Sequence, residues 1–186
     1  MADSRFSRVV SLACHDLRTP LATVYGFART LNRLDHHDER TGRFLAMIEE
    51  AAEQMTEMLD TLGTAARIEG ERWEPVLREA DTLELVRADD PRVAVVGDGD
   101  VVQTEVETVT RALRALAVAA LRYGPADQVT WSVSGRELAL SPVSDGAAPV
   151  VTAEEVRDLG SVVARAVIER LGGSFQLDGR VLRVRL

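Results

Sequence analysis

The chain has 186 residues, 46% of them apolar, with 22 basic against 30 acidic side chains and a formal net charge of −8 at pH 7. This length allows two small domains, and the acidic charge disfavours nucleic acid or an anionic membrane as a direct partner. A single cysteine excludes an internal disulfide framework, and the absence of any long apolar run or signal peptide predicts a cytoplasmic protein.

The first predicted element is a long amphipathic helix. Its apolar residues alternate steps of four and three, the spacing of a helix packed in a bundle. The repeat consists of Phe6, Val10, Ala13, Leu17, Pro20, Val24, Phe27, Leu31 and Leu34. With Val10 and Leu17 at position a of the heptad, His15 falls at position f, where it faces water. Thr19 lies one turn further along, on roughly the same face. Pro20 lacks a backbone N–H, so it predicts a bend just after the histidine.

A functional role for His15 has to be weighed against the possibility that it is an ordinary surface histidine. A surface histidine on a helix is usually a solvated side chain, and we interpret His36 and His37, in the polar turn Asp35–Asp38, in that way. A proline inside a helix costs ~3 kcal/mol, so helix propensity does not explain why Pro20 follows an exposed His-Asp-x-x-Thr cluster. Its position indicates a functional role for the cluster. Spacing does not establish that Asp16 assists His15, because neighbours on a helix diverge by about 100°.

A second long helix repeats the four-three spacing. Its stripe consists of Phe44, Ile48, Ala51, Met55, Met58, Leu62 and Ala65, widened by Leu45, Ala52, Leu59 and Ala66. A hairpin of two such helices cannot bury both stripes against itself, and a second copy would close the open side. We therefore expect a homodimeric four-helix bundle.

The heptad ends at Glu69-Gly70-Glu71-Arg72, which predicts domains at 1–70 and 71–186. Mixed elements follow: a strand at Arg92–Val96, a helix at Val101–Tyr123, strands at Gln128–Ser134 and Glu137–Ser141, a helix at Ala153–Leu171, and strands at Ser174–Leu177 and Val181–Leu186. Two of the strand pairs read as hairpins, across Gly135 and across Asp178-Gly179. This order predicts an α/β sandwich.

The run His15-Asp16-Leu17-Arg18-Thr19-Pro20-Leu21 resembles the H-box of the dimerisation and histidine-phosphotransfer domain of two-component sensor histidine kinases. The second half is similar to the GHKL-type ATP-binding domain of the same family. The matching segments are Arg122–Pro125, Val143–Gly146, Leu159–Ser161 and Leu171–Gly173. The resemblance implies a helical hairpin that forms a dimeric four-helix bundle, followed by a reduced Bergerat-like α/β sandwich.

The chain departs from that family where nucleotide is bound. Ala115 and Ala119 stand where the family carries magnesium-binding asparagines, and a methyl group supplies no oxygen ligand. Ala147-Ala148-Pro149 replaces the glycines that allow close approach to a phosphate, and the short segment Val150–Glu155 leaves no room for a lid over ATP. Asp145 stands where the family carries an aspartate that pairs with the adenine amino group. We interpret Asp145 as a vestigial nucleotide contact or as a turn-forming aspartate.

These features predict a phosphorelay histidine phosphotransferase without a tightly bound cofactor and without ATP chemistry. His15 is the expected nucleophile, Asp16 orients or deprotonates its imidazole, and Thr19 positions the incoming group or a water. The expected partners are the receiver domains of response regulators, which supply Mg²⁺ and meet a surface of Arg18, Ala22 and Gly26. Two alternatives stay open: an ATP-dependent histidine kinase with a divergent site, and a non-catalytic regulator that binds receivers or kinases.

Overall fold

A computed structural model describes residues 4–33 and 38–186, and of residues 4–9 it describes the backbone alone. Most of the predicted turn, including His36 and His37, therefore lies outside the described residues. The chain divides into two compact units, with the division after Trp73. In the parts described, no helix is both long enough and apolar enough to cross a membrane.

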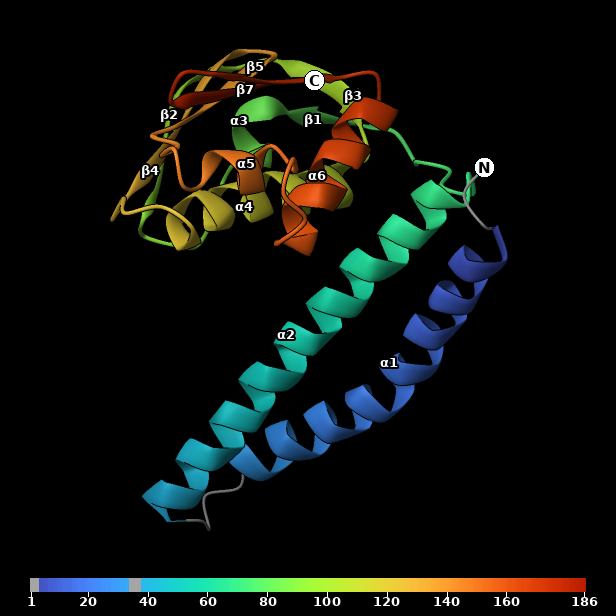
Figure 1. The fold of residues 1–186 in the computed structure, drawn as a ribbon. Helices are drawn as coiled ribbons and strands as arrows, with labels where there is room; N and C mark the ends of the chain where they lie inside the picture. The colour runs from blue at the N-terminus through green and yellow to red at the C-terminus, as the bar shows by residue number, and fades with distance from the viewer. Residues whose placement is uncertain (1–3, 34–37) are drawn as a thin grey trace. The chain divides into compact units, whose positions relative to one another are not determined.

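The first unit is a hairpin of two long helices, α1 (Ser4–Asn32) and α2 (Glu39–Glu69) (Figure 1). Asp38 begins α2, because its carboxylate accepts a hydrogen bond of 2.7 Å from the backbone N–H of Thr41. Gly70 ends it, with its own N–H bonded to the carbonyl oxygens of Ala66 and Ile68. The predicted hairpin and the predicted helix end at Gly70 are confirmed.

Helix α1 runs through Pro20 without interruption, and Figure 1 shows that α1 is bent along its length. Proline cannot donate the hydrogen bond to the carbonyl four residues earlier, so a bent but continuous helix is the expected outcome.

The contact inside the hairpin differs from the predicted seam. Among the described side chains of α1, the buried ones are Cys14, Leu21 and Ala28, at seven-residue intervals. Leu17 and Val24 of the predicted seam remain 55% and 47% exposed. The two helices approach closely at Cys14, because a Cβ added at Gly63 of α2 would lie 4.0 Å from its Cβ. The predicted seam is left as an open apolar stripe, and α2 adds to it; the exposed members include Leu17, Val24, Phe27, Leu31, Phe44, Ile48, Met55, Met58 and Leu62.

The second unit is built on a five-stranded sheet in the order β2-β4-β5-β7-β6. Its strands are β2 (Val93–Gly99), β4 (Val129–Gly135), β5 (Glu137–Ser141), β6 (Ser174–Asp178) and β7 (Val181–Arg185). Strands β2 and β4 are parallel, and the other pairs are antiparallel. Alternate residues of β4, such as Val129, Trp131 and Val133, are buried, as expected for a sheet with one covered face.

Three helices, α4 (Val106–Arg122), α5 (Ala148–Val151) and α6 (Leu159–Arg170), lie together on one side of this sheet (Figure 1). The predicted α/β sandwich is therefore confirmed. Both of its predicted hairpins are present, with Gly135 and Gly179 at φ values of 59° and 57° in their turns.

Two predicted helix starts are wrong. Val101–Thr104 forms strand β3, which pairs with β1 (Arg78–Asp81), and α4 begins only after Glu105, whose carboxylate accepts from the N–H of Thr108 at 2.8 Å. The β-branched pair Val101-Val102 favours the strand. The helix predicted from Ala153 begins instead at Leu159, capped by Asp158. The short elements β1 and α3 (Thr82–Leu85) were not predicted.

Candidate functional site

His15 lies on the outward face of α1, and its side chain is 76% exposed. Cys14 and Leu21 are buried on the adjacent side of α1, about 100° around the helix, so α1 cannot rotate His15 inward without losing that packing. Nδ1 of His15 lies 3.2 Å from Oδ1 of Asp16, while among the described residues Nε2 has no hydrogen-bond partner. A carboxylate that accepts a proton from Nδ1 leaves Nε2 with the lone pair, so Nε2 is the nitrogen open to a reactant.

A shallow open groove of about 530 Å³ surrounds the imidazole. Its lining consists of His15, Arg18, Thr19, Ala22 and Thr23. The structure therefore brings together His15 and Thr19, which the sequence analysis placed on one face. The hydroxyl of Thr23 donates to the carbonyl oxygen of Thr19 at 3.2 Å, which fixes the rotamer of Thr23 at the far end of the groove.

Arg18, predicted as a partner-binding residue, forms an ion pair across the hairpin. Its Nη2 lies 2.7 Å from Oδ1 of Asp60 on α2, and the two side chains are 41% and 32% exposed. The sequence analysis missed Asp60. Its position between Leu59 and Leu62, inside an apolar stripe, was the available signal, because a carboxylate beside a packed face needs a cationic partner.

Ala22 and Gly26 continue the same face, and both are exposed. A Cβ added at Gly26 would meet no atom within 4 Å, so the hairpin itself does not require glycine there. The surface beyond the groove is therefore low and unobstructed. That is a suitable shape for a partner that lies along α1.

The second unit holds Ala115 and Ala119, the positions that the sequence analysis matched to magnesium-binding asparagines. Ala119 is completely buried, and a Cβ added at Gly160 on α6 would lie 2.8 Å from Cβ of Ala115 on α4. The two helices thus touch at Ala115, and a longer side chain there would meet the first turn of α6. Across the described ranges, no three His, Cys, Asp or Glu side chains are grouped to hold a metal ion.

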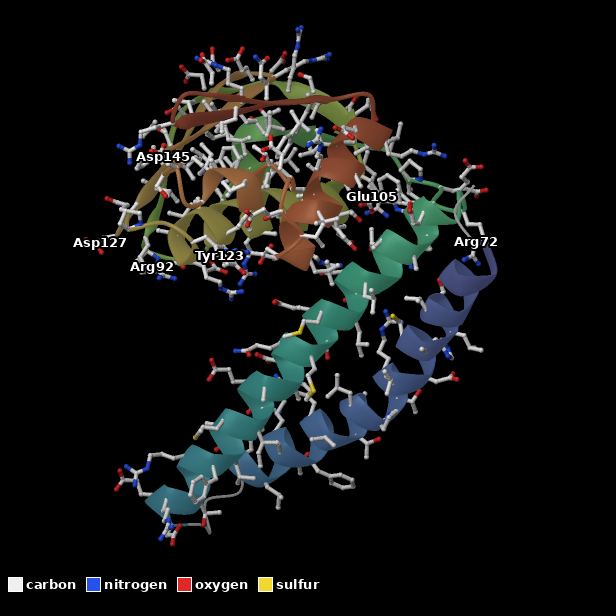
Figure 2. All side chains as sticks on the ribbon, viewed as in Figure 1. Arg72, Arg92, Glu105, Tyr123, Asp127 and Asp145 are labelled. Carbon is white, nitrogen blue, oxygen red and sulfur yellow. The ribbon has the colours of Figure 1, made fainter. Side chains whose placement is uncertain are left out.

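The segment between the two glycine-box positions is short and bonded to itself. The N–H of Ala147 bonds the carbonyl oxygen of Ser144 at 3.0 Å, and the N–H of Glu155 bonds that of Pro149 at 2.8 Å. Asp145 is exposed and lies within the Ser144–Ala147 turn; Figure 2 labels it. The Tyr123 hydroxyl donates to the carbonyl oxygen of Arg157 at 3.1 Å, which ties the end of the segment to the end of α4.

Comparison with known proteins matches the helical hairpin to a family model and the whole chain to part of a longer relative. Residues 7–71 match the His Kinase A (phospho-acceptor) domain. The sensor protein KdpD of Mycobacterium tuberculosis, in strains CDC 1551 and H37Rv, is 30% identical over 211 aligned positions. That alignment covers 94% of this chain, which spans only 24% of the length of the KdpD protein.

Two solved structures share the fold. Full-length ShkA, crystallised in complex with AMPPNP, has a TM-score of 0.64 at 17% identity, covering 95% of this chain and 44% of that one. The Acinetobacter baumannii histidine kinase AdeS has a TM-score of 0.54 at 18% identity, covering 92% of this chain and 96% of that one. Both likenesses concern the arrangement of a helical hairpin followed by an α/β unit.

Proposed function

From the premise that this chain is a two-component histidine kinase-type protein, with a His Kinase A hairpin and an ATPase-like fold, we propose that it works as a histidine phosphotransferase. In this role it passes a phosphoryl group between the aspartates of receiver domains through His15. The main support is the imidazole itself: it is exposed, its Nδ1 contacts Asp16, and its Nε2 is open to the groove.

In the proposed reaction, Nε2 of His15 attacks the phosphorus of a receiver phosphoaspartate. The N–P bond forms as the acyl-phosphate P–O bond breaks, and the aspartate leaves as a carboxylate. The imidazole becomes cationic as its lone pair is shared, and Asp16, which accepts the Nδ1 proton, stabilises that charge. A second receiver then takes the phosphoryl group by the reverse step. Thr19 lies in the same groove and positions the incoming group or a water.

The partners follow from the same surface. The receiver domain brings the phosphoaspartate and its Mg²⁺, and it meets Arg18, Ala22 and Gly26 along α1. The open apolar stripe on both helices is closed by a second copy of the chain, which gives a homodimeric four-helix bundle. Apolar side chains left 38–67% exposed on one face support such a partner.

The second unit supports transfer from a partner in preference to ATP. Magnesium on a nucleotide needs oxygen ligands, and Ala115 and Ala119 supply none. The closeness of Ala115 to Gly160 leaves no space there for a longer side chain, and the segment that would be a lid is taken up by α5 and tight turns. We propose that this unit acts as a docking surface that holds the receiver over His15.

An ATP-dependent histidine kinase is the second candidate. The family comparisons fit it at least as well, because the relatives are a sensor protein and histidine kinases, and ShkA was crystallised with an ATP analogue. The two candidates share His15 and its groove. They differ in the source of the phosphoryl group.

The deciding experiment supplies the two sources separately. The purified protein is mixed with a ³²P-labelled phosphoreceiver without ATP, and in parallel with Mg·[γ-³²P]ATP without a receiver. We expect acid-labile label only in the first mixture, and none in a His15→Gln control. Labelling from ATP alone would establish the kinase candidate. Receiver binding without label in either mixture would leave only the non-catalytic regulator.

A further inference from the structure

The helical unit contains a second cavity, separate from the groove at His15. Its volume is about 280 Å³, and its lining consists of Ser11, Cys14, Arg18, Gly63, Arg67 and Arg72. Half of these residues are arginines, which come from α1, from the last turn of α2 and from the segment that follows α2. Of the six, only Arg18 also lines the groove at His15.

The local charge of this arginine cavity is positive, although the chain as a whole has a net charge of −8. Arg18 is paired with Asp60 at 2.7 Å, and Arg67 donates to the hydroxyl of Thr64 at 3.1 Å. Among the residues that the structure describes, no carboxylate lies within ion-pair distance of Arg67 or Arg72. Of these three guanidinium groups, only that of Arg18 has a carboxylate partner among the described residues.

The backbone directs these arginines toward one another. Gly63 is buried, and a Cβ added there would lie 4.0 Å from Cβ of Cys14, so the two helices are close at the floor of the cavity. After Gly70 the chain turns back, and the N–H of Arg72 bonds the carbonyl oxygen of Arg67 at 2.8 Å. The Arg72 guanidinium folds over this turn, since a Cβ added at Gly70 would lie 3.0 Å from its Nε. Figure 2 shows Arg72 beside the end of α2 and the start of α1.

Helix stability accounts for only part of this arrangement. Arg67 lies in the last turn of α2, where a cation complements the helix dipole. That explanation does not reach Arg72, which lies beyond the helix, or Arg18, which belongs to the other helix. Nor does it explain why all three line one cavity.

We propose that the arginine cavity binds a small, multiply charged oxyanion of the phosphate class. Guanidinium groups present paired N–H donors that match the oxygens of phosphate, and several of them converging on one anion give both charge and geometry. A cavity of about 280 Å³ accommodates such an anion together with some of its water, because one water occupies about 30 Å³. The Ser11 side chain adds a hydroxyl to the lining.

The position of Arg18 between the two cavities gives the site a consequence. An anion that engages Arg18 competes with Asp60 for its guanidinium, and Arg18 also forms part of the wall beside His15. The bound anion would thus alter the surface that a partner of His15 meets. This inference does not depend on the proposed phosphotransfer, because binding is measured without any partner.

The test is calorimetric titration of the whole chain with inorganic phosphate and with pyrophosphate, at constant ionic strength. We expect saturable binding, tighter for pyrophosphate, and weakening by at least about tenfold in Arg67→Gln and in Arg72→Gln. Both side chains are exposed, so the variants should fold. Arg43→Gln is the matched control, because Arg43 is an exposed arginine of α2 whose partner is Glu39. It should bind as the unmodified chain does.

Cys14 provides a second readout, because it is the only cysteine of the chain and it lines the cavity. Cys14 is buried, so iodoacetamide reaches it only when the hairpin opens locally. Phosphate bound in the cavity should therefore slow this alkylation in the unmodified chain and in Arg43→Gln, but not in Arg67→Gln. Two results would overturn the proposal: no saturable binding of either anion in the millimolar range, or binding that is unchanged in both Arg67→Gln and Arg72→Gln.

Discussion

Nδ1 of His15 and Oδ1 of Asp16 lie 3.2 Å apart, although the two residues are consecutive on α1. Side chains of neighbouring helical residues diverge by about 100°, so the contact exists only because both side chains turn toward each other in solvent. Both are largely exposed, at 76% and 67%, so the pair adds little to stability. Its effect is on the imidazole, since it selects which ring nitrogen is free.

The first prediction separates the nucleophile from the residue that orients it. His15→Gln should abolish phosphoryl acceptance from a phosphorylated receiver. Asp16→Asn should slow acceptance by about 10- to 100-fold, because an amide can no longer take up the Nδ1 proton or stabilise the imidazolium. Rapid-quench measurement of acid-labile label gives both rates. Circular dichroism should show unchanged helix in each variant, and a folded His15→Gln protein that still accepts label would contradict the assignment.

Much of this site could be predicted from local pattern. The heptad placed His15 on the outer face, and Gly70 marked the end of the second helix. The His-Asp-x-x-Thr-Pro run singled out His15 as the candidate nucleophile, which stays a prediction. These features depend on residues within one or two turns of each other, which a sequence displays directly.

What could not be predicted depends on residues far apart in the chain. Arg18 meets Asp60 across 42 positions, and the arginine cavity needs the turn after Gly70 to bring Arg72 back to α2. The hairpin contact at Cys14 depends on the small residue Gly63 on the facing helix, which allows a close approach that hydrophobicity alone does not rank.

The second prediction concerns the ion pair of Arg18 and Asp60. A double-mutant cycle with Arg18→Gln and Asp60→Asn should give a coupling energy of about 0.5–1 kcal/mol in urea unfolding. This is less than a buried pair gives, because solvent screens half-exposed charges. The cycle of Glu39→Gln and Arg43→Gln is the control: that pair is 3.5 Å apart and far more exposed, so its coupling should be near zero. Equal coupling in the two cycles would refute the structural role.

The third prediction concerns assembly. Met55→Asp or Leu62→Asp would place an unpaired charge in the closed stripe, and each should dissociate the dimer or unfold the chain. Multi-angle light scattering at micromolar concentration measures the outcome. Gln54→Asp adds the same charge at an exposed polar position of α2 and should leave the dimer intact. If the unmodified chain is a monomer under these conditions, the dimeric bundle is wrong.

The fourth prediction tests whether the second unit gains ATP binding when position 119 carries the asparagine that the resemblance implies there. Ala119 lies on α4 and is completely buried, so Ala119→Asn must fit a larger side chain and bury its amide. We expect a loss of about 1–3 kcal/mol in the free energy of unfolding, and no gain of Mg·ATP binding. Ala22→Asn, at an exposed position of α1, is the control; its cost should be about 0.5 kcal/mol, from helix propensity alone.

Calorimetry of the unmodified chain should likewise show no saturable binding of Mg·ATP in the range where a metal-bound nucleotide is held by oxygen ligands. Stoichiometric binding there, followed by labelling of His15, would instead identify the chain as an ATP-dependent kinase whose metal ligands lie outside Ala115 and Ala119.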